Sequence, residues 1–78
     1  MRKIQINIVK TEINRIKVVL AETKKKNIWL AKQLNKNTST ISQWCTNKRQ
    51  PTLENLYKIA NVLNVDIRDL LNPTKIIK

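Results

Sequence analysis

The sequence predicts an all-α fold in which five short helices pack as one bundle. Two observations support this prediction. In four segments apolar residues recur three and four positions apart, which places them on one face of a helix. Residues typical of helix ends flank these segments. A chain of 78 residues is long enough for one domain.

The chain contains no glycine, so other residues must take the positions at helix ends where glycine is usual. Helices often end on a residue with left-handed backbone, and after glycine the residue that best tolerates this conformation is asparagine. Asn35, Asn47 and Asn64 each follow a helical pattern. We therefore expect these three residues to stand in for glycine, with ordinary polar loop residues as the alternative.

Composition excludes several classes of function. Sixteen Lys and Arg against five Asp and Glu give a net charge of +11, which indicates an anionic partner. Nucleic acid is the first candidate and an anionic membrane surface the second. With one cysteine and no histidine, we expect no internal disulfide, no metal, no cofactor and no enzyme activity. The chain also lacks a signal-peptide pattern and an apolar run of about 18 residues, so we expect a cytoplasmic protein without membrane contact.

The chain divides into three predicted parts: an N-terminal extension at residues 1–10, a helical domain at 11–72 and a tail at 73–78. In the extension Ile4, Ile6 and Ile8 alternate with polar residues, which is typical of a half-buried strand. A lone strand needs a partner, either residues 75–78 or the same strand of a second subunit. The alternative is a frayed basic arm.

The first two helices are predicted at residues 11–23 and 27–34. Thr11 is the expected N-cap of the first, whose core-facing stripe is Ile13, Ile16, Val19 and Leu20. The second turns Leu30, Ala31 and Leu34 inward. Between the helices, Lys24–Lys26 form either a solvated loop or an edge that faces phosphates.

The third helix, residues 38–45, follows a turn at 35–37 and has Asn37 as its expected cap. Its inner stripe is Ile41, Trp44 and Cys45, and its outer face carries Thr38, Ser39, Ser42 and Gln43. That outer face has no charge, only short donors and acceptors. Such a face suits reading hydrogen-bond patterns in a DNA major groove. The short turn lets the second and third helices cross steeply, so the pair is predicted to be a helix-turn-helix.

Two further helices complete the predicted bundle. Pro51 makes residues 46–51 a loop, and its Lys48 and Arg49 are well placed for backbone phosphates. Thr52 caps a fourth helix at 53–63, and Asp66 caps a short fifth helix at 67–71 that Asn72-Pro73 ends. The stripe of the fourth helix is Leu53, Leu56, Ile59, Ala60 and Leu63.

Four runs of this sequence together resemble the Cro and phage-repressor type of helix-turn-helix protein, the XRE-like transcriptional regulators. The runs are Leu30-Ala-Lys-Gln-Leu-Asn-Lys-Asn-Thr-Ser-Thr-Ile-Ser-Gln-Trp44, Asn47-Lys-Arg-Gln-Pro-Thr-Leu-Glu-Asn-Leu56, Ile59-Ala60 and Val65-Asp-Ile-Arg-Asp-Leu-Leu71. The resemblance covers roughly residues 12–72. It implies a five-helix, repressor-like DNA-binding bundle with residues 38–45 as the recognition helix.

The resemblance also implies a set of contact residues on double-stranded DNA. The positions expected to touch bases are Asn37, Thr38, Ser39, Ser42 and Gln43. Gln43 is the first choice because its amide can pair with two groups on an adenine edge. The positions expected to touch phosphates are Lys26, Asn27, Thr46, Asn47, Lys48 and Arg49.

Some positions depart from the family pattern. Many relatives form a partly buried ion pair where this chain has Leu20 and Cys45, which makes Cys45 a predicted core residue and not a nucleophile. The family's glycines are replaced by Asn35 and Asn47, and its apolar residue before the second helix is Lys25.

The expected assembly is a homodimer on an inverted-repeat operator, because one such domain reads too few base pairs for a genomic address. The fifth helix and the termini, including Leu70, Ile76 and Ile77, are the predicted dimer surface. The predicted function is transcriptional regulation, most simply repression. One alternative is an antitoxin that binds a toxin protein as well as DNA. Another is a nonspecific basic protein, which would not explain the uncharged outer face.

Overall fold

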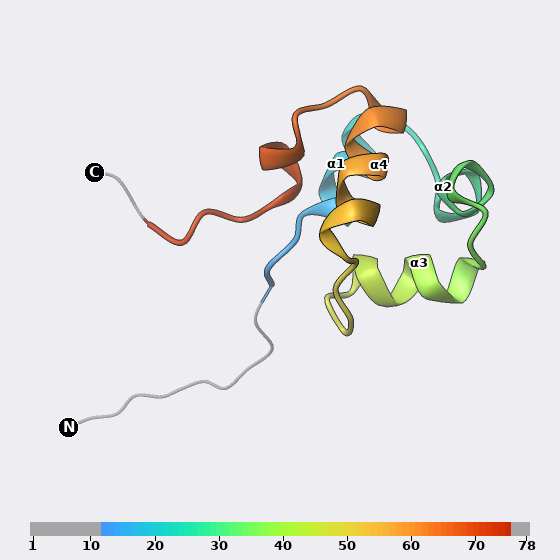
Figure 1. Cartoon of the computed structure of the whole chain (residues 1–78), viewed down its shortest axis with the longest axis horizontal. Coiled ribbons are helices and arrows are strands. Elements are labelled where there is room, and N and C mark those ends of the chain that lie inside the picture. Colours follow the sequence, from blue (N-terminus) through green and yellow to red (C-terminus); the bar gives the residue numbers. More distant parts are fainter. Residues whose placement is uncertain (1–11, 76–78) are drawn as a thin grey trace.

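The computed structural model describes residues 12–75, which fold into four α-helices and one 3₁₀ helix (Figure 1). The α-helices are α1 (Ile16–Glu22), α2 (Asn27–Leu34), α3 (Thr38–Cys45) and α4 (Leu53–Leu63), and the 3₁₀ helix is η1 (Ile67–Leu70). The all-α class is confirmed, and the bounds of α2, α3 and α4 agree with the prediction.

The prediction of five α-helices is wrong, and no terminal strand is found within residues 12–75. The fifth element is a 3₁₀ helix of four residues, because Asp66 caps it at one end and Leu71 already has extended backbone at the other. Residues 12–75 contain no strand, only an isolated antiparallel bridge between Asn14 and Leu71. The predicted strand at residues 1–10, like Ile76 and Ile77, lies outside the described residues.

Helix α1 begins later than predicted because the preceding residues pair with the C-terminal segment. The Arg15 amide donates to the Leu70 carbonyl (2.8 Å), and the Asn72 amide donates to the Ile13 carbonyl (2.9 Å). This pairing holds residues 13–15 outside the helix and leaves Ile13 49% exposed, so its predicted place in the core is wrong. Arg15 occupies the N-cap position, and Thr11 lies outside the described residues.

One apolar core joins all five elements. Helix α3 packs on α2 and α1, and α4 packs on α2 and η1. The most deeply buried side chains are Ile16, Val19, Leu30, Ile41, Ile59 and Leu70. Leu53 is 74% exposed, so its predicted core position is wrong, because it is the first residue of α4 and turns away from the stripe that continues at Leu56. Leu70 is fully buried and cannot form the predicted dimer surface.

The predicted left-handed asparagines and three of the predicted N-caps are confirmed. Asn35, Asn47 and Asn64 have φ angles of 55°, 60° and 58°, the left-handed conformation that glycine usually supplies. Lys24, at the end of α1, shares this conformation with φ 60° and was not predicted. The side chains of the three expected caps accept main-chain hydrogen bonds at the start of the third, fourth and fifth elements: Asn37, Thr52 and Asp66.

No helix within the described part of the chain is long and apolar enough to cross a membrane.

Candidate nucleic-acid interface

Helix α3 lies along one edge of the bundle and has two unlike faces (Figure 1). Ile41, Trp44 and Cys45 are buried against the other helices. On the outer face Thr38, Ser39 and Ser42 are exposed and Gln43 is half-buried. The structure therefore places the predicted base-reading side chains together on one solvent-facing surface.

Three of these side chains form no hydrogen bond that holds the fold. Thr38, Ser42 and Gln43 form no side-chain hydrogen bond within residues 12–75, although the main-chain carbonyls of Ser42 and Gln43 accept bonds from Thr46. Their hydroxyl and amide groups are therefore available to a partner. Gln43 offers a donor and an acceptor on the same planar group, which is the pattern needed for an adenine edge.

Asn37 and Ser39 are partly committed to the start of α3. The Asn37 side-chain oxygen accepts hydrogen bonds from the Thr40 amide, the Thr40 hydroxyl and the Ser39 hydroxyl, each at 2.9 Å. The Asn37 amide nitrogen and the Ser39 oxygen lone pairs remain for a base edge. The structure thus gives Asn37 two roles, of which capping is the one it already performs.

The start of α2 contributes the predicted phosphate-facing residues Lys26 and Asn27. Lys26 is exposed at the N-cap position of α2, and its side chain does not cap the helix. Asn27 is half-buried, and its side-chain oxygen accepts a hydrogen bond from the Cys45 thiol (3.6 Å). The Lys25 ammonium lies 4.6 Å from the centre of the Trp29 ring, a cation–π contact that holds the preceding loop against α2.

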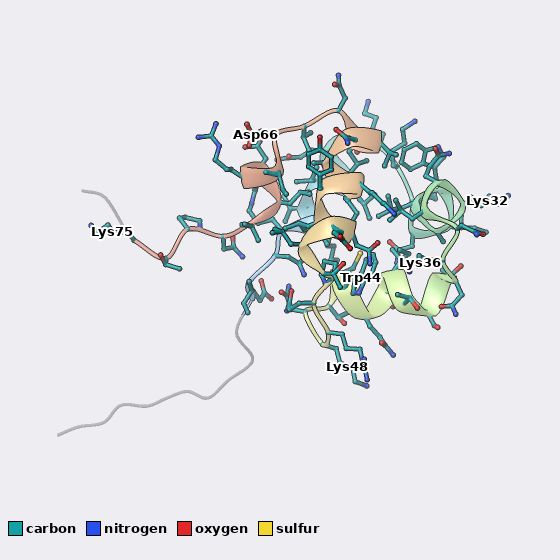
Figure 2. The ribbon with its side chains drawn as sticks, viewed as in Figure 1. Lys32, Lys36, Trp44, Lys48, Asp66 and Lys75 are labelled. Carbon is teal, nitrogen blue, oxygen red and sulfur yellow. The ribbon has the colours of Figure 1, made fainter. Side chains whose placement is uncertain are left out.

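The loop at residues 46–50, which we call the phosphate loop, begins directly at the end of α3. The Thr46 hydroxyl donates to the carbonyls of Ser42 (3.1 Å) and Gln43 (3.3 Å). The main-chain amides of Lys48 and Arg49 both donate to the Gln43 carbonyl, at 3.0 and 3.2 Å. Both cationic side chains are exposed, and Lys48 points away from the bundle on the side of α3 (Figure 2).

Sequence reasoning missed the residues that fix this loop. Asn14 is only 3% exposed, and its amide nitrogen donates to the Trp44 carbonyl (2.9 Å) and the Gln50 side-chain oxygen (2.7 Å). The Asn47 side-chain oxygen accepts hydrogen bonds from the main-chain amides of Ile13 and Asn14, each at 2.9 Å. No spacing in the sequence links positions so far apart along the chain, so the only available signal was the predicted left-handed backbone of Asn47.

These bonds change what the predicted phosphate contact at Asn47 can do. Its side-chain oxygen also accepts from the Gln50 amide nitrogen (3.1 Å), and its own amide nitrogen donates to the Asn14 carbonyl (3.1 Å). The side-chain oxygen is therefore used inside the protein, and the second N–H of the side-chain amide is the group that remains for a phosphate.

Cys45 behaves as the core residue that the sequence predicted. It belongs to the same buried cluster as Leu20, so both positions of the family's ion pair are apolar here. Burial raises the pKa of the Cys45 thiol, and the charge of Lys17 offsets this only in part. A thiol with a raised pKa is a weak nucleophile at neutral pH.

Comparisons with known proteins agree with this geometry. A model of the helix-turn-helix family HTH_3 matches residues 29–70, which cover most of α2, all of α3 and α4, and η1. The chain belongs to this helix-turn-helix family. The resemblance to Cro and phage-repressor type regulators of the XRE class is thereby confirmed.

A solved structure is similar to this chain over most of its own length. It is the crystal structure of a candidate DNA-binding protein from Bacteroides fragilis, with 58% sequence identity and a TM-score of 0.76. The match covers 77% of this chain and 97% of that one. No curated protein matches the chain. Asn14, Lys26 and Asn27 lie before the residues that the family model matches.

Proposed function

We propose that this helix-turn-helix protein is a sequence-specific regulator of transcription that inserts α3 into the DNA major groove. The observation that carries the proposal is the outer face of α3. Its side chains are polar and uncharged, and within residues 12–75 those of Thr38, Ser42 and Gln43 form no internal hydrogen bond. Such a face contributes little to the fold, whereas it matches the donors and acceptors of base edges.

Phosphate contacts would come from the start of α2 and from the phosphate loop, which both adjoin the C-terminal end of α3. Lys26 stands at the start of α2, and Lys48 and Arg49 stand at the tip of the phosphate loop. Contacts of this kind supply affinity and orientation but no sequence information. Thr46, Asn27 and Asn47 adjoin the same surface and complete the proposed contact set.

A homodimer on an inverted repeat belongs to the proposal, with repression in the cytoplasm as the simplest outcome. Leu53 and Tyr57 are 74% and 61% exposed on the outer face of α4, and together with Ile67 they line an open hollow of about 570 Å³. Exposed apolar side chains one helical turn apart favour association with another protein surface. They replace the buried Leu70 as the candidate contact between subunits. Light scattering of the DNA complex tests this point, since a monomeric mass contradicts it.

The antitoxin hypothesis adds a toxin protein as a second partner of the same DNA-binding domain. It does not compete with the base-reading role of α3, because antitoxins of this fold also bind DNA. A toxin gene beside the gene for this chain would favour it.

The proposal is tested by measuring binding to a selected operator and to a scrambled duplex at two salt concentrations. A sequence-specific protein keeps its preference for the operator as salt rises, because base contacts release few counterions. Equal loss of affinity for both duplexes, with no preference at either salt concentration, would instead indicate a nonspecific basic protein.

A further inference from the structure

We propose that Asn14 and Asn47 are positioning residues for DNA binding, and that Gln50 completes their set. The three side chains, which we call the amide clasp, hold the phosphate loop so that Lys48 and Arg49 meet the DNA backbone in one fixed arrangement. The inference rests on the proposed function, but it concerns hydrogen bonds inside the protein and not contacts with DNA.

The clasp is centred on Asn14, the one buried polar residue within the described part of the chain. Its side-chain oxygen accepts a hydrogen bond from the Ile16 amide (3.0 Å) at the start of α1. Its amide nitrogen donates to the Trp44 carbonyl at the end of α3 and to Gln50 at the end of the phosphate loop. A single buried amide therefore ties α1, α3 and the loop together, and both of its polar atoms are satisfied.

Asn47 closes the other side of the loop. Its left-handed backbone turns the chain sharply, and its side chain exchanges hydrogen bonds with the main chain of Asn14 in both directions. Gln50 then bridges the two asparagines, donating to Asn47 and accepting from Asn14.

The clasp lies directly at the base of the two cations. Lys48 and Arg49 are the only residues between Asn47 and Gln50, so both neighbours of this pair are anchored while the pair itself is exposed. An anchored loop loses less conformational freedom when it binds than a free loop would. Because all three clasp side chains are uncharged, they add no charge of their own to the attraction between the loop and the phosphates.

Because Asn14 is uncharged, the substitution Asn14→Ala tests the positioning role without changing the net charge. The substitution changes no charge, yet we expect roughly tenfold weaker binding to operator and scrambled duplexes alike, equivalent to the removal of one charge-assisted hydrogen bond. The slope of log affinity against log salt should become shallower by about 0.9 for each phosphate that the loop no longer binds. The ratio between the two duplexes should not change. Binding is measured where circular dichroism shows every variant fully folded.

Ile59→Val and Ile59→Ala serve as controls of matched stability. Ile59 is fully buried on α4, a helix that carries none of the clasp residues, and the two changes are expected to bracket the destabilisation caused by Asn14→Ala. If Asn14→Ala leaves affinity and salt slope as they are in these controls, the proposal is overturned.

A variant that lacks both loop cations tests whether Asn14 affects DNA binding through Lys48 and Arg49. In a protein carrying Lys48→Ala and Arg49→Ala, Asn14→Ala should weaken DNA binding no further, because the groups it positions are absent. A further tenfold loss in that background would show that Asn14 acts elsewhere. Should Asn14→Ala prevent folding, Gln50→Ala replaces it, since Gln50 is exposed and its removal leaves the bonds of Asn14 to Trp44 and Ile16 in place.

Failure of the amide clasp and failure of the proposed regulator role give different results. If the wild-type protein shows no sequence preference, the proposed regulator role fails. The clasp is still tested on the scrambled duplex alone, where the chain, with its net charge of +11, binds through phosphates.

Discussion

The outer face of α3 and the phosphate loop are neighbours in space, but the protein builds them in opposite ways. Within residues 12–75 the side chains of Thr38, Ser42 and Gln43 have no hydrogen-bonding role in the fold, whereas the loop is held by bonds from Asn14, Asn47 and Gln50. In the proposed function, the choice of DNA sequence would therefore depend on side chains that the fold does not need. The affinity for the DNA backbone would depend on a loop that the fold holds with several hydrogen bonds.

The largest expected effect comes from breaking the loop at Asn47. Asn47→Ala removes the side-chain hydrogen bonds. It also places alanine, which tolerates left-handed backbone less well than asparagine, at φ 60°. We therefore expect a loss of about 2–4 kcal/mol in the free energy of unfolding. Asn47→Gly removes the same bonds but accepts the backbone, and should lose about 1 kcal/mol less. Urea denaturation of both variants measures the difference. Equal stability of Asn47→Ala and wild type would contradict the role given to this residue.

The next effect concerns the cations themselves. Lys48→Ala combined with Arg49→Ala should weaken binding to every sequence, and should reduce the salt slope by about 1.8 if each residue holds one phosphate. Stability should stay within about 0.5 kcal/mol of wild type, because both side chains are exposed. Lys32→Ala combined with Lys75→Ala removes the same charge from exposed positions outside the proposed interface. An equal change of slope in this control would mean that total charge, and not the loop, sets affinity.

Gln43→Ala should show the reverse behaviour. We expect no measurable change in stability, an unchanged salt slope, and a loss of about 1–3 kcal/mol of discrimination at one base pair. Titrations against operators substituted at one position at a time measure this. The outer face of α3, with Thr38, Ser39, Ser42 and Gln43, is called the reading face for its proposed role. A uniform loss over all positions would mean that Gln43 supports the structure and does not belong to the reading face.

Ser42→Ala is the smallest of these changes. The hydroxyl is exposed and makes no hydrogen bond to the rest of residues 12–75, so the fold should not respond. One neutral hydrogen bond to DNA would contribute about 0.5–1.5 kcal/mol. A change in stability larger than in affinity would contradict the separation of reading face from fold.

Much of the fold was predictable because its signals are local. The bounds of α2, α3 and α4 follow from apolar spacing and from caps such as Asn37 and Thr52, which act within three residues. The left-handed asparagines were predictable because a chain without glycine has few other residues for such positions.

The errors came from contacts between distant parts of the chain. Helix α1 starts late because residues 13–15 pair with residues 70–72, and η1 stays short for the same reason. The left-handed backbone of Lys24 ends α1, where the amides of Lys24 and Lys25 donate to the carbonyls of Ala21 and Leu20, and a run of three lysines does not indicate such an end.

The candidate site divides in the same way. The members of the reading face were predicted because they share one helix, and the structure brings them together on a solvent-facing surface. The predicted contacts with bases and phosphates stay predictions. The amide clasp joins the approach to α1, the end of α3 and the loop, so only the folded structure could reveal it.

The proposed role of α3 in reading DNA can be tested by selecting bound sequences from random DNA with the wild-type protein, Gln43→Ala and Arg49→Ala. We expect an inverted-repeat motif for wild type and the same motif for Gln43→Ala with relaxed choice at one base pair of each half-site. For Arg49→Ala we expect an unchanged motif at lower affinity. A motif that is identical for wild type and Gln43→Ala, or one that changes with Arg49→Ala instead, would contradict the assignment of α3 as the element that reads the DNA sequence.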